Sequence, residues 1–125
     1  MGLAMASSKC TFCNVGPGDA WMSTNLVVAM LHPEPIGPCH LMVAPRRHVP
    51  AFYDLDLQEQ RQLWDALAEL RLRIAATIVV SGFDAGFVDA TRGQEDTFHT
   101  FIHLVPRIQN HPSVLPPGPE WVDLG

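Results

Sequence analysis

The chain has 125 residues, of which 47% are hydrophobic and 17% are charged, and its formal net charge is −5. This length allows one domain with its own hydrophobic core and is too short for two such domains. A surface that follows nucleic-acid phosphates needs an excess of clustered Lys and Arg, so the acidic balance argues against a nucleic-acid partner.

The N-terminal sequence and the apolar runs bear on localisation. No apolar run approaches the roughly 20 residues of a membrane-spanning helix. The first ten residues, MGLAMASSKC, lack the charged start and the long apolar core of a secretion signal. We therefore expect a soluble, cytoplasmic protein without membrane contact.

Three cysteines occur in the chain, and two of them, Cys10 and Cys13, form a C-x-x-C pair. An odd number of cysteines does not suit a secreted disulfide framework. Three interpretations of the pair remain open: a metal site, a redox dithiol, and two incidental thiols in a reducing compartment. The third cysteine, Cys39, is predicted to be a small buried residue.

Apolar patterning predicts an α+β architecture. Asp56 and Glu59 have the spacing of a capping box, and apolar residues that follow at helical spacing predict one long helix over residues 57–74. An antiparallel sheet with this helix on one face fits the order of the elements. Runs rich in valine, leucine and phenylalanine predict strands at four places: 25–32, 40–45, 83–88 and 97–105.

The elements define one domain that spans residues 1–125. Its ordered core is expected over about residues 10–107. The tail over residues 111–125 is rich in proline, and we expect no regular element there.

The segment TFHTFIHLVPR, Thr97 to Arg107, carries two histidines four residues apart. Because side chains of a strand alternate between faces, His99, Phe101 and His103 are predicted to share one face. The alternate residues are mostly apolar and are predicted to face the core. A row of His, Phe and His is a candidate site, although two polar surface residues would give the same pattern.

The segment HTFIHLVPR resembles the signature of the histidine triad family, in which three histidines alternate with apolar residues, often before Pro-Arg. The Pro-Arg ending places His99 at the first triad position, Phe101 at the middle one and His103 at the third. Other segments resemble the family in the same order: CTFC, HLMVAPRRHV, the long helix and GFVD.

The resemblance implies a sheet of about five antiparallel strands with one long helix, homodimers that continue the sheet, and action on nucleotide phosphates. In the family the middle histidine attacks the α-phosphate and forms a covalent nucleotidyl intermediate. This chain has Phe101 at that position. A phenyl ring has no lone pair to donate, so the covalent route cannot pass through it.

Three further positions of the family's nucleotide pocket differ in this chain. His32 stands where an acidic residue holds the ribose, and Val88 stands where the family has asparagine. Glu95 stands where a glutamine bonds the phosphate. A carboxylate about 4 Å from a phosphate charge is repelled by roughly 4 kcal/mol at an effective dielectric near 20. These residues, with Phe101 and His103, make up the predicted ligand pocket.

A subset of the family binds a structural zinc ion, and the resemblance carries its four ligands over to this chain. Two thiolates and two neutral imidazoles would give zinc a closed tetrahedral shell. A thioredoxin-like dithiol suits the C-x-x-C pair less well, because the pair precedes a turn rather than a strand-to-helix junction. The implied ligands are Cys10, Cys13, His48 and His99.

Two hypotheses about function follow from the resemblance. The first is a zinc-stabilised histidine triad domain that has lost covalent nucleotidyl transfer and serves as a binding or structural homodimer. The second is an active nucleotide hydrolase or transferase, in which His103 or His32 acts as nucleophile or general base. The predicted helix, which includes Trp64, carries more apolar residues than one face needs, and this favours a dimer.

Overall fold

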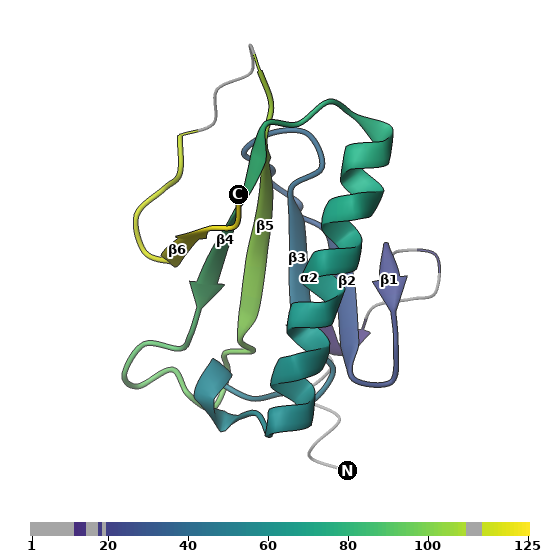
Figure 1. The fold of residues 1–125 in the computed structure, drawn as a ribbon. Helices are drawn as coiled ribbons and strands as arrows, with labels where there is room; N and C mark the ends of the chain where they lie inside the picture. Colours follow the sequence, from purple (N-terminus) through teal and green to yellow (C-terminus); the bar gives the residue numbers. More distant parts are fainter. Residues whose placement is uncertain (1–11, 15–17, 19, 110–113) are drawn as a thin grey trace.

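The computed structural model describes residues 12–14, 18, 20–109 and 114–125. In this part of the chain one long helix, α2 (Leu57–Thr77), lies across a six-stranded antiparallel sheet (Figure 1). The strands lie in the order β1-β2-β3-β5-β4-β6. They are β1 (Met22–Ser23), β2 (Val27–Leu31), β3 (Leu41–Pro45), β4 (Gly82–Val88), β5 (Phe101–Arg107) and β6 (Glu120–Asp123). Two short 3-10 turns are η1 (Phe12–Asn14) and η2 (Phe52–Asp54).

The start of α2 is fixed by the capping box that its sequence predicts. The Asp56 carboxylate accepts the Glu59 backbone N–H at 2.8 Å, and the Glu59 carboxylate accepts the Asp56 N–H at 3.1 Å. Glu59 is buried, and Arg47 donates to both of its carboxylate oxygens. The capping box therefore satisfies two backbone donors at the helix start.

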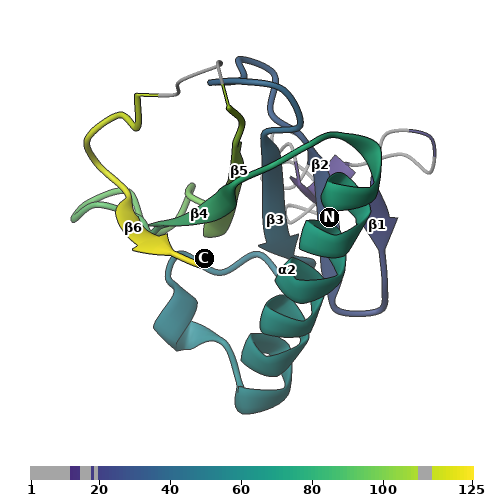
Figure 2. The same cartoon turned by 45° about the horizontal axis from the view of Figure 1, so that its top comes forward.

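The main core lies between α2 and the sheet (Figure 2). Apolar residues at helical spacing on α2 pack against alternate residues of the central strands, as period-two patterning requires. Strand β3 is buried along its whole length because both of its faces are covered. The packed residues include Leu63, Leu67, Leu70 and Ile74 of α2, and Val27, Leu41, Val43, Ile102 and Leu104 of the sheet.

The opposite face of the sheet carries the predicted triad strand. A second, smaller cluster of Phe12, Val28, Met42 and Ala44 packs there, with Phe101 against it. Strand register places His103 beside Met42 on one side and beside Gly86 on the other. Gly86 in turn lies beside Trp121 of β6. The side chains that share this face therefore come from both ends of the chain.

The largest difference from a predicted boundary is at the start of β5. Strand β5 begins at Phe101 and not at residue 97. Before that point the Thr100 N–H bonds to the Val49 carbonyl, and the Thr100 hydroxyl donates to the Asp89 carboxylate, so this stretch is held by loops.

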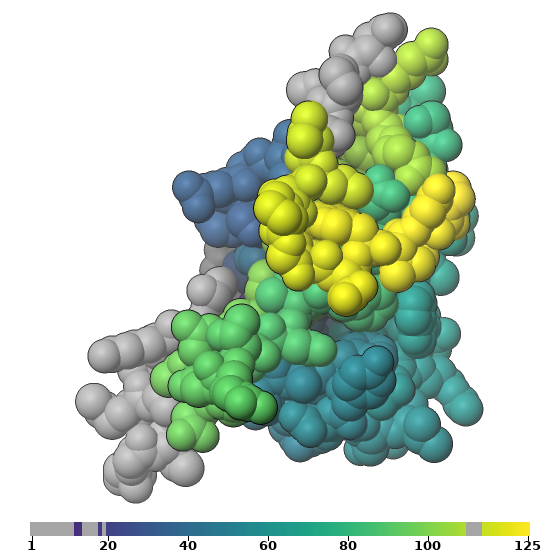
Figure 3. All heavy atoms as spheres, turned by 90° about the vertical axis from the view of Figure 1, so that its left-hand side faces the viewer, coloured from purple at the N-terminus to yellow at the C-terminus, as the bar shows by residue number. Residues whose placement is uncertain are grey.

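The expectation of no regular element in residues 111–125 is wrong, because β6 pairs with β4 along the edge of the sheet. The prolines of the described tail all precede Glu120, so they leave the strand itself unbroken. In the space-filling view of this edge, the C-terminal segment in yellow lies above the blue-teal region around η2 (Figure 3). Among the described residues, none of the helices combines the length and the apolar character needed to cross a membrane.

Candidate functional site: two histidine clusters on one side of the sheet

Cys13, His48 and His99 form the first cluster, here called the thiol–imidazole cluster. They come from η1, from the loop after β3 and from the residues just before β5. The Cys13 Sγ lies 3.4 Å from the His48 Nδ1 and 3.8 Å from the His99 Nδ1. The ligand atoms all lie within 4.8 Å of one another, so the group could hold a metal ion.

The hydrogen bonds of His99 fix which of its nitrogens carries the proton. His99 Nε2 lies 2.7 Å from the Pro45 carbonyl oxygen, and a carbonyl can only accept, so Nε2 carries the hydrogen. Burial lowers the pKa of His99 and keeps its ring neutral near pH 7. The Nδ1 lone pair then faces Cys13. A histidine that binds a metal through one nitrogen and donates the other N–H to a backbone carbonyl has this arrangement.

The remaining predicted zinc ligand, Cys10, lies outside the described residues. The donor set of one thiol and two imidazoles otherwise suits zinc, which binds thiolate sulfur and neutral histidine nitrogen in structural sites.

His32, His40 and His103 form the second cluster, here called the imidazole cluster. His32 follows β2, His40 precedes β3 and His103 lies in β5. The His40 Nε2 lies 2.8 Å from the His103 Nδ1. The His32 ring stacks on His40 at a centroid distance of 4.5 Å and on His103 at 5.3 Å.

Backbone donors determine the tautomers of the imidazole cluster. The Ile36 N–H donates to the His40 Nδ1 at 3.0 Å, so in neutral His40 the proton sits on Nε2. That proton donates to the His103 Nδ1, which leaves the proton of neutral His103 on its Nε2. His32 likewise accepts the Glu34 N–H at its Nδ1, so its neutral ring carries the proton on Nε2.

Metal binding suits the imidazole cluster less well than the thiol–imidazole cluster, although its ligand atoms are equally close. Each Nδ1 atom of His32 and His40 accepts a backbone N–H, whereas a metal-bound histidine donates from its second nitrogen. The neutral rings of the imidazole cluster therefore offer Nε2–H donors, whereas a metal ion would need nitrogen lone pairs.

The charge state of the imidazole cluster follows from its burial. Burial lowers the pKa of His40 to about 4, with further lowering from His32 and His103. Burial and His32 together lower the pKa of His103 to about 4. Both rings are therefore neutral at pH 7.

Phe101 lies between the two clusters. Its ring centroid is 5.3 Å from that of Phe12, which contacts His99, and 4.9 Å from that of His103. Phe98 also contacts Phe101, at 6.1 Å, although strict alternation predicts opposite faces for these two residues. Phe98 precedes the first residue of β5, where the alternation begins. An apolar ring thus separates the candidate metal ligands from the imidazole donors.

Of the other two predicted pocket residues, Val88 lies beside Phe101 and Glu95 does not. Val88 is the cross-strand partner of Phe101. Glu95 is exposed in the loop after β4, where its carboxylate accepts the Gly93 N–H at 2.8 Å. Among the described residues, no hydrogen bond or ring contact joins Glu95 to Phe101 or His103.

Two residues that contact His103, His40 and Trp121, were not predicted as site residues. His40 shares the alternation of Met42 and Ala44, so the face of its strand could have been predicted from that pattern. Trp121 stacks on His103 at 5.7 Å, and its ring lies so close to Gly86 that a Cβ there would come within 2.6 Å of it. No pattern in the proline-rich tail indicates this contact.

An antiparallel sheet with one long helix on one face and histidines of the triad strand on the other defines an α+β domain of the histidine triad class. A model of the HIT domain matches residues 15–110, and the chain belongs to this family.

Relatives and solved structures agree with this assignment. The chain is 29% identical over 93 residues to a bifunctional bis(5'-adenosyl)-triphosphatase/adenylylsulfatase FHIT of Arabidopsis thaliana, covering 74% of the chain and 52% of that protein. It is 26% identical over 89 residues to a bis(5'-adenosyl)-triphosphatase of Dictyostelium discoideum, covering 71% of the chain and 60% of that protein. The chain thus spans little more than half of either relative. A HIT family protein from Bacillus anthracis shares the fold, with a TM-score of 0.70, 20% identity and coverage of 86% and 82% of the two chains.

Proposed function

We propose that this HIT domain binds a nucleotide-like small molecule beside the imidazole cluster and does not form a covalent nucleotidyl intermediate. The names of its relatives support a nucleotide ligand. The observation that carries the second part is Phe101, whose ring lies between the clusters at the middle triad position. Covalent transfer needs a lone pair at that position.

The tautomers of the imidazole cluster support binding over catalysis. In their neutral forms His103 and His32 hold their protons on Nε2, and both Nδ1 lone pairs accept hydrogen bonds. Neither ring then has a lone pair with which to attack phosphorus or to remove a proton from water. An N–H group can still donate to a phosphate or ribose oxygen, which suits a binding role.

Incubation with diadenosine triphosphate and with adenosine phosphoramidate tests this proposal. We expect no release of AMP above the buffer control, and we expect AMP to bind in a calorimetric titration. His103→Leu should weaken AMP binding, whereas Met30→Leu, an apolar change on the same face, should leave it unchanged. Release of AMP that His103→Leu abolishes would overturn the proposal and favour the hydrolase hypothesis.

We also propose that a structural zinc ion binds Cys13, His48 and His99 together with Cys10. The Nε2–H of His99 donates to the Pro45 carbonyl, and this supports Nδ1 as the coordinating atom. With two thiolates and two imidazoles the shell would be closed, so the ion would stabilise the fold and leave no position for substrate. The requirement for reduced thiols supports a cytoplasmic location.

Elemental analysis of the purified protein tests the zinc proposal. We expect about one zinc per chain, as four ligands to a single ion imply. Cys13→Ser should remove most of the metal, whereas Cys39→Ser, at a cysteine outside the cluster, should retain it. Purified protein without zinc, even after growth and purification with added zinc, would contradict the proposal.

We propose a homodimer that forms through α2. The outward side of this helix exposes Leu57 at 79%, Trp64 at 43% and Leu72 at 74%, more apolar surface than a solvent-facing helix needs. Sedimentation at micromolar concentration should give a species heavier than the 13.8 kDa chain. A single species at the monomer mass would refute the dimer.

A further inference from the structure

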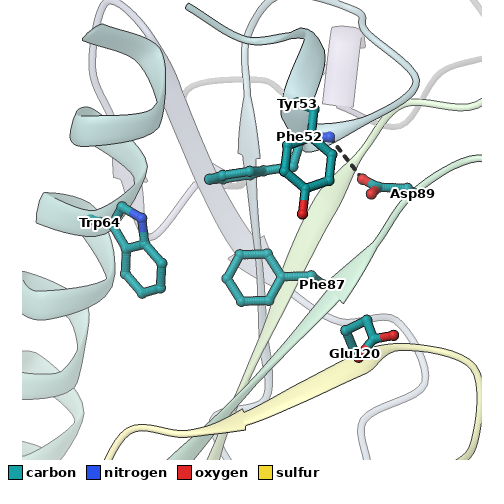
Figure 4. A pocket seen from close by; sticks show the side chains of 6 residues that line it. All are labelled: Phe52, Tyr53, Trp64, Phe87, Asp89 and Glu120. Atoms are coloured by element: carbon teal, nitrogen blue, oxygen red, sulfur yellow. Dashed lines mark hydrogen bonds between the residues drawn. The ribbon is translucent and has the colours of Figure 1, made fainter. Parts of the chain in front are cut away.

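Trp121 of β6 lies on the same side of the sheet as the imidazole cluster. Cross-strand register places Trp121 beside Gly86 and Gly86 beside His103, so these residues form one row across β6, β4 and β5. The preceding residue, Glu120, pairs with Phe87, and both line a recess on the helix side (Figure 4). Because the side chains of a strand alternate between faces, the Trp121 side chain points away from this recess. It therefore lies on the face that carries the proposed nucleotide site.

The glycine at position 86 lets the indole ring of Trp121 lie over the sheet. A Cβ at Gly86 would lie 2.6–2.8 Å from three adjacent atoms of the six-membered ring. At so short a range, three adjacent ring atoms are almost equally close only to a point above the ring plane, so the indole turns one face to Gly86. Trp121 is half-buried. Since its inner face lies against the sheet, the exposed part belongs to the outward side of the ring.

Two contacts hold the indole ring in this orientation. Its Nε1–H donates to the Pro116 carbonyl at 2.9 Å, so the polar atom of the ring already has a partner. The ring also stacks on His103, with the centroids 5.7 Å apart and 28° between the planes. A flat group placed on the outward side of the indole would therefore run nearly parallel to the His103 ring. Trp121 thus offers an apolar ring face of fixed orientation beside the Nε2–H donor of His103.

We propose that Trp121 stacks on the base of the ligand and so determines that the site prefers nucleotides to sugar phosphates. This inference rests on the proposed nucleotide site beside the imidazole cluster. The short distance from the indole to His103 lets one mononucleotide contact both, with its base on Trp121 and its sugar or phosphate oxygens near the imidazole N–H groups. Every base has a π-face that can stack on an aromatic side chain. Trp121 therefore selects for the presence of a base and not for one particular base.

Calorimetric titrations with AMP and with ribose 5-phosphate, which lacks the base, test the stacking role. The native protein should bind AMP at least about fivefold more tightly, the lower end of what one stacked base contributes. Trp121→Leu should bring the two affinities close together and leave that for ribose 5-phosphate unchanged. Trp121→Phe keeps a ring face and should retain most of the preference. Tyr53→Leu removes a ring that is 87% exposed on the helix side, and it should alter neither affinity.

The outcomes separate this inference from the proposed function. Equal affinities of the native protein for AMP and ribose 5-phosphate would overturn the stacking role and leave the binding site in place. The stacking role would also fail if Trp121→Phe lost the preference as fully as Trp121→Leu. Loss of both affinities in Trp121→Leu would show that the side chain only supports the fold of the site. If the native protein bound neither ligand, the proposed function and this inference would fail together.

Discussion

At the scale of single residues, our proposal that the domain forms no covalent nucleotidyl intermediate depends on one side chain, Phe101. The Phe101 ring packs among Phe12, Phe98 and His103. It adds apolar contact where a nucleophile would need a lone pair and partners that orient a phosphate. Its neighbours pack against a phenyl ring, and a substitution at position 101 alone does not change these neighbours.

We predict that Phe101→His does not produce a hydrolase. The new imidazole would lie between apolar Phe12 and the His103 ring, and the N–H donors of the imidazole cluster alone would not hold a phosphate in line with it for attack. AMP release from diadenosine triphosphate should remain at the level of the unmodified protein. A variant that adds Glu95→Gln, Val88→Asn and His32→Asp should bind AMP more tightly than Phe101→His alone. Strong hydrolysis by the single variant would show that the pocket is intact.

The pKa values of His40 and His103 make folding stability depend on pH. Both are lowered to about 4, below the ordinary value of 6.5, so the unfolded chain binds more protons between these limits. Stability is therefore full above about pH 6.5 and is lost as the pH falls towards 4. For His40, which is 1% exposed, the loss is about 3 kcal/mol.

Urea unfolding at pH 7, 6 and 5 measures this dependence. His40→Asn, whose amide oxygen can accept the Ile36 N–H in place of Nδ1, should reduce the dependence across this range and leave the share that His103 contributes. An unchanged pH dependence in this variant would show that other groups cause it.

At the scale of single elements, the capping box of Asp56 and Glu59 is a local sequence signal that sets where α2 begins. We predict that Asp56→Ala lowers the free energy of unfolding by about 1 kcal/mol, because it removes the acceptor of the Glu59 N–H. Asp65→Ala removes the same charge from an exposed position within the helix and serves as the control. Its effect should stay within about 0.5 kcal/mol. Equal losses in the two variants, measured by urea unfolding, would argue against a capping role.

The pairing of β6 with β4 depends on the close approach of Trp121 to Gly86. We predict that Gly86→Ala loosens β6, because the added Cβ would lie 2.6 Å from the Trp121 ring. Backbone amides of residues 121–123 should then exchange hydrogen faster, while those of β3 stay protected. In a Trp121→Ala background the same change should have little further effect. Unaltered exchange in the single variant would contradict the steric argument.

The sequence predicted those elements whose signals are local. Runs of apolar residues located β2, β3 and β4, and the capping box located the start of α2. The start of β5 was missed because hydrogen bonds of Thr100 to distant loops, and not local propensity, hold the residues before it. Strand β6 was missed because it forms only against the open edge of β4.

The candidate site was predictable to a similar extent. Strand alternation predicted a row of His99, Phe101 and His103, and the family signature singled out the same three residues; of these, Phe101 and His103 lie in β5 and His99 lies just before it. The hydrogen bond from His40 to His103 joins residues 63 positions apart, so no local pattern contains it. The tautomers of the histidines likewise cannot be predicted from the sequence, because they depend on which backbone groups face each ring.

At the scale of the whole molecule, the thiol–imidazole cluster joins distant parts of the chain. Cys13 is 35 residues from His48 and 86 residues from His99. Binding free energy at a structural metal site is folding free energy, so a chelator should lower the melting temperature measured by calorimetry. Cys13→Ser should have the same low melting temperature with and without chelator. A native protein whose melting is insensitive to chelator would contradict this prediction.

Strand β6 contributes to both sides of the sheet, since Glu120 is the cross-strand partner of Phe87, which packs against the main core, while Trp121 stacks on His103. A ligand that binds either side only when β6 is paired will increase the population of molecules in which β6 is paired. Thermodynamic linkage makes this effect reciprocal: a ligand on one side of the sheet raises the affinity for a ligand on the other side by the same factor as the second ligand raises the affinity for the first. A four-residue edge strand can thus couple two opposite surfaces while the core between them stays unchanged.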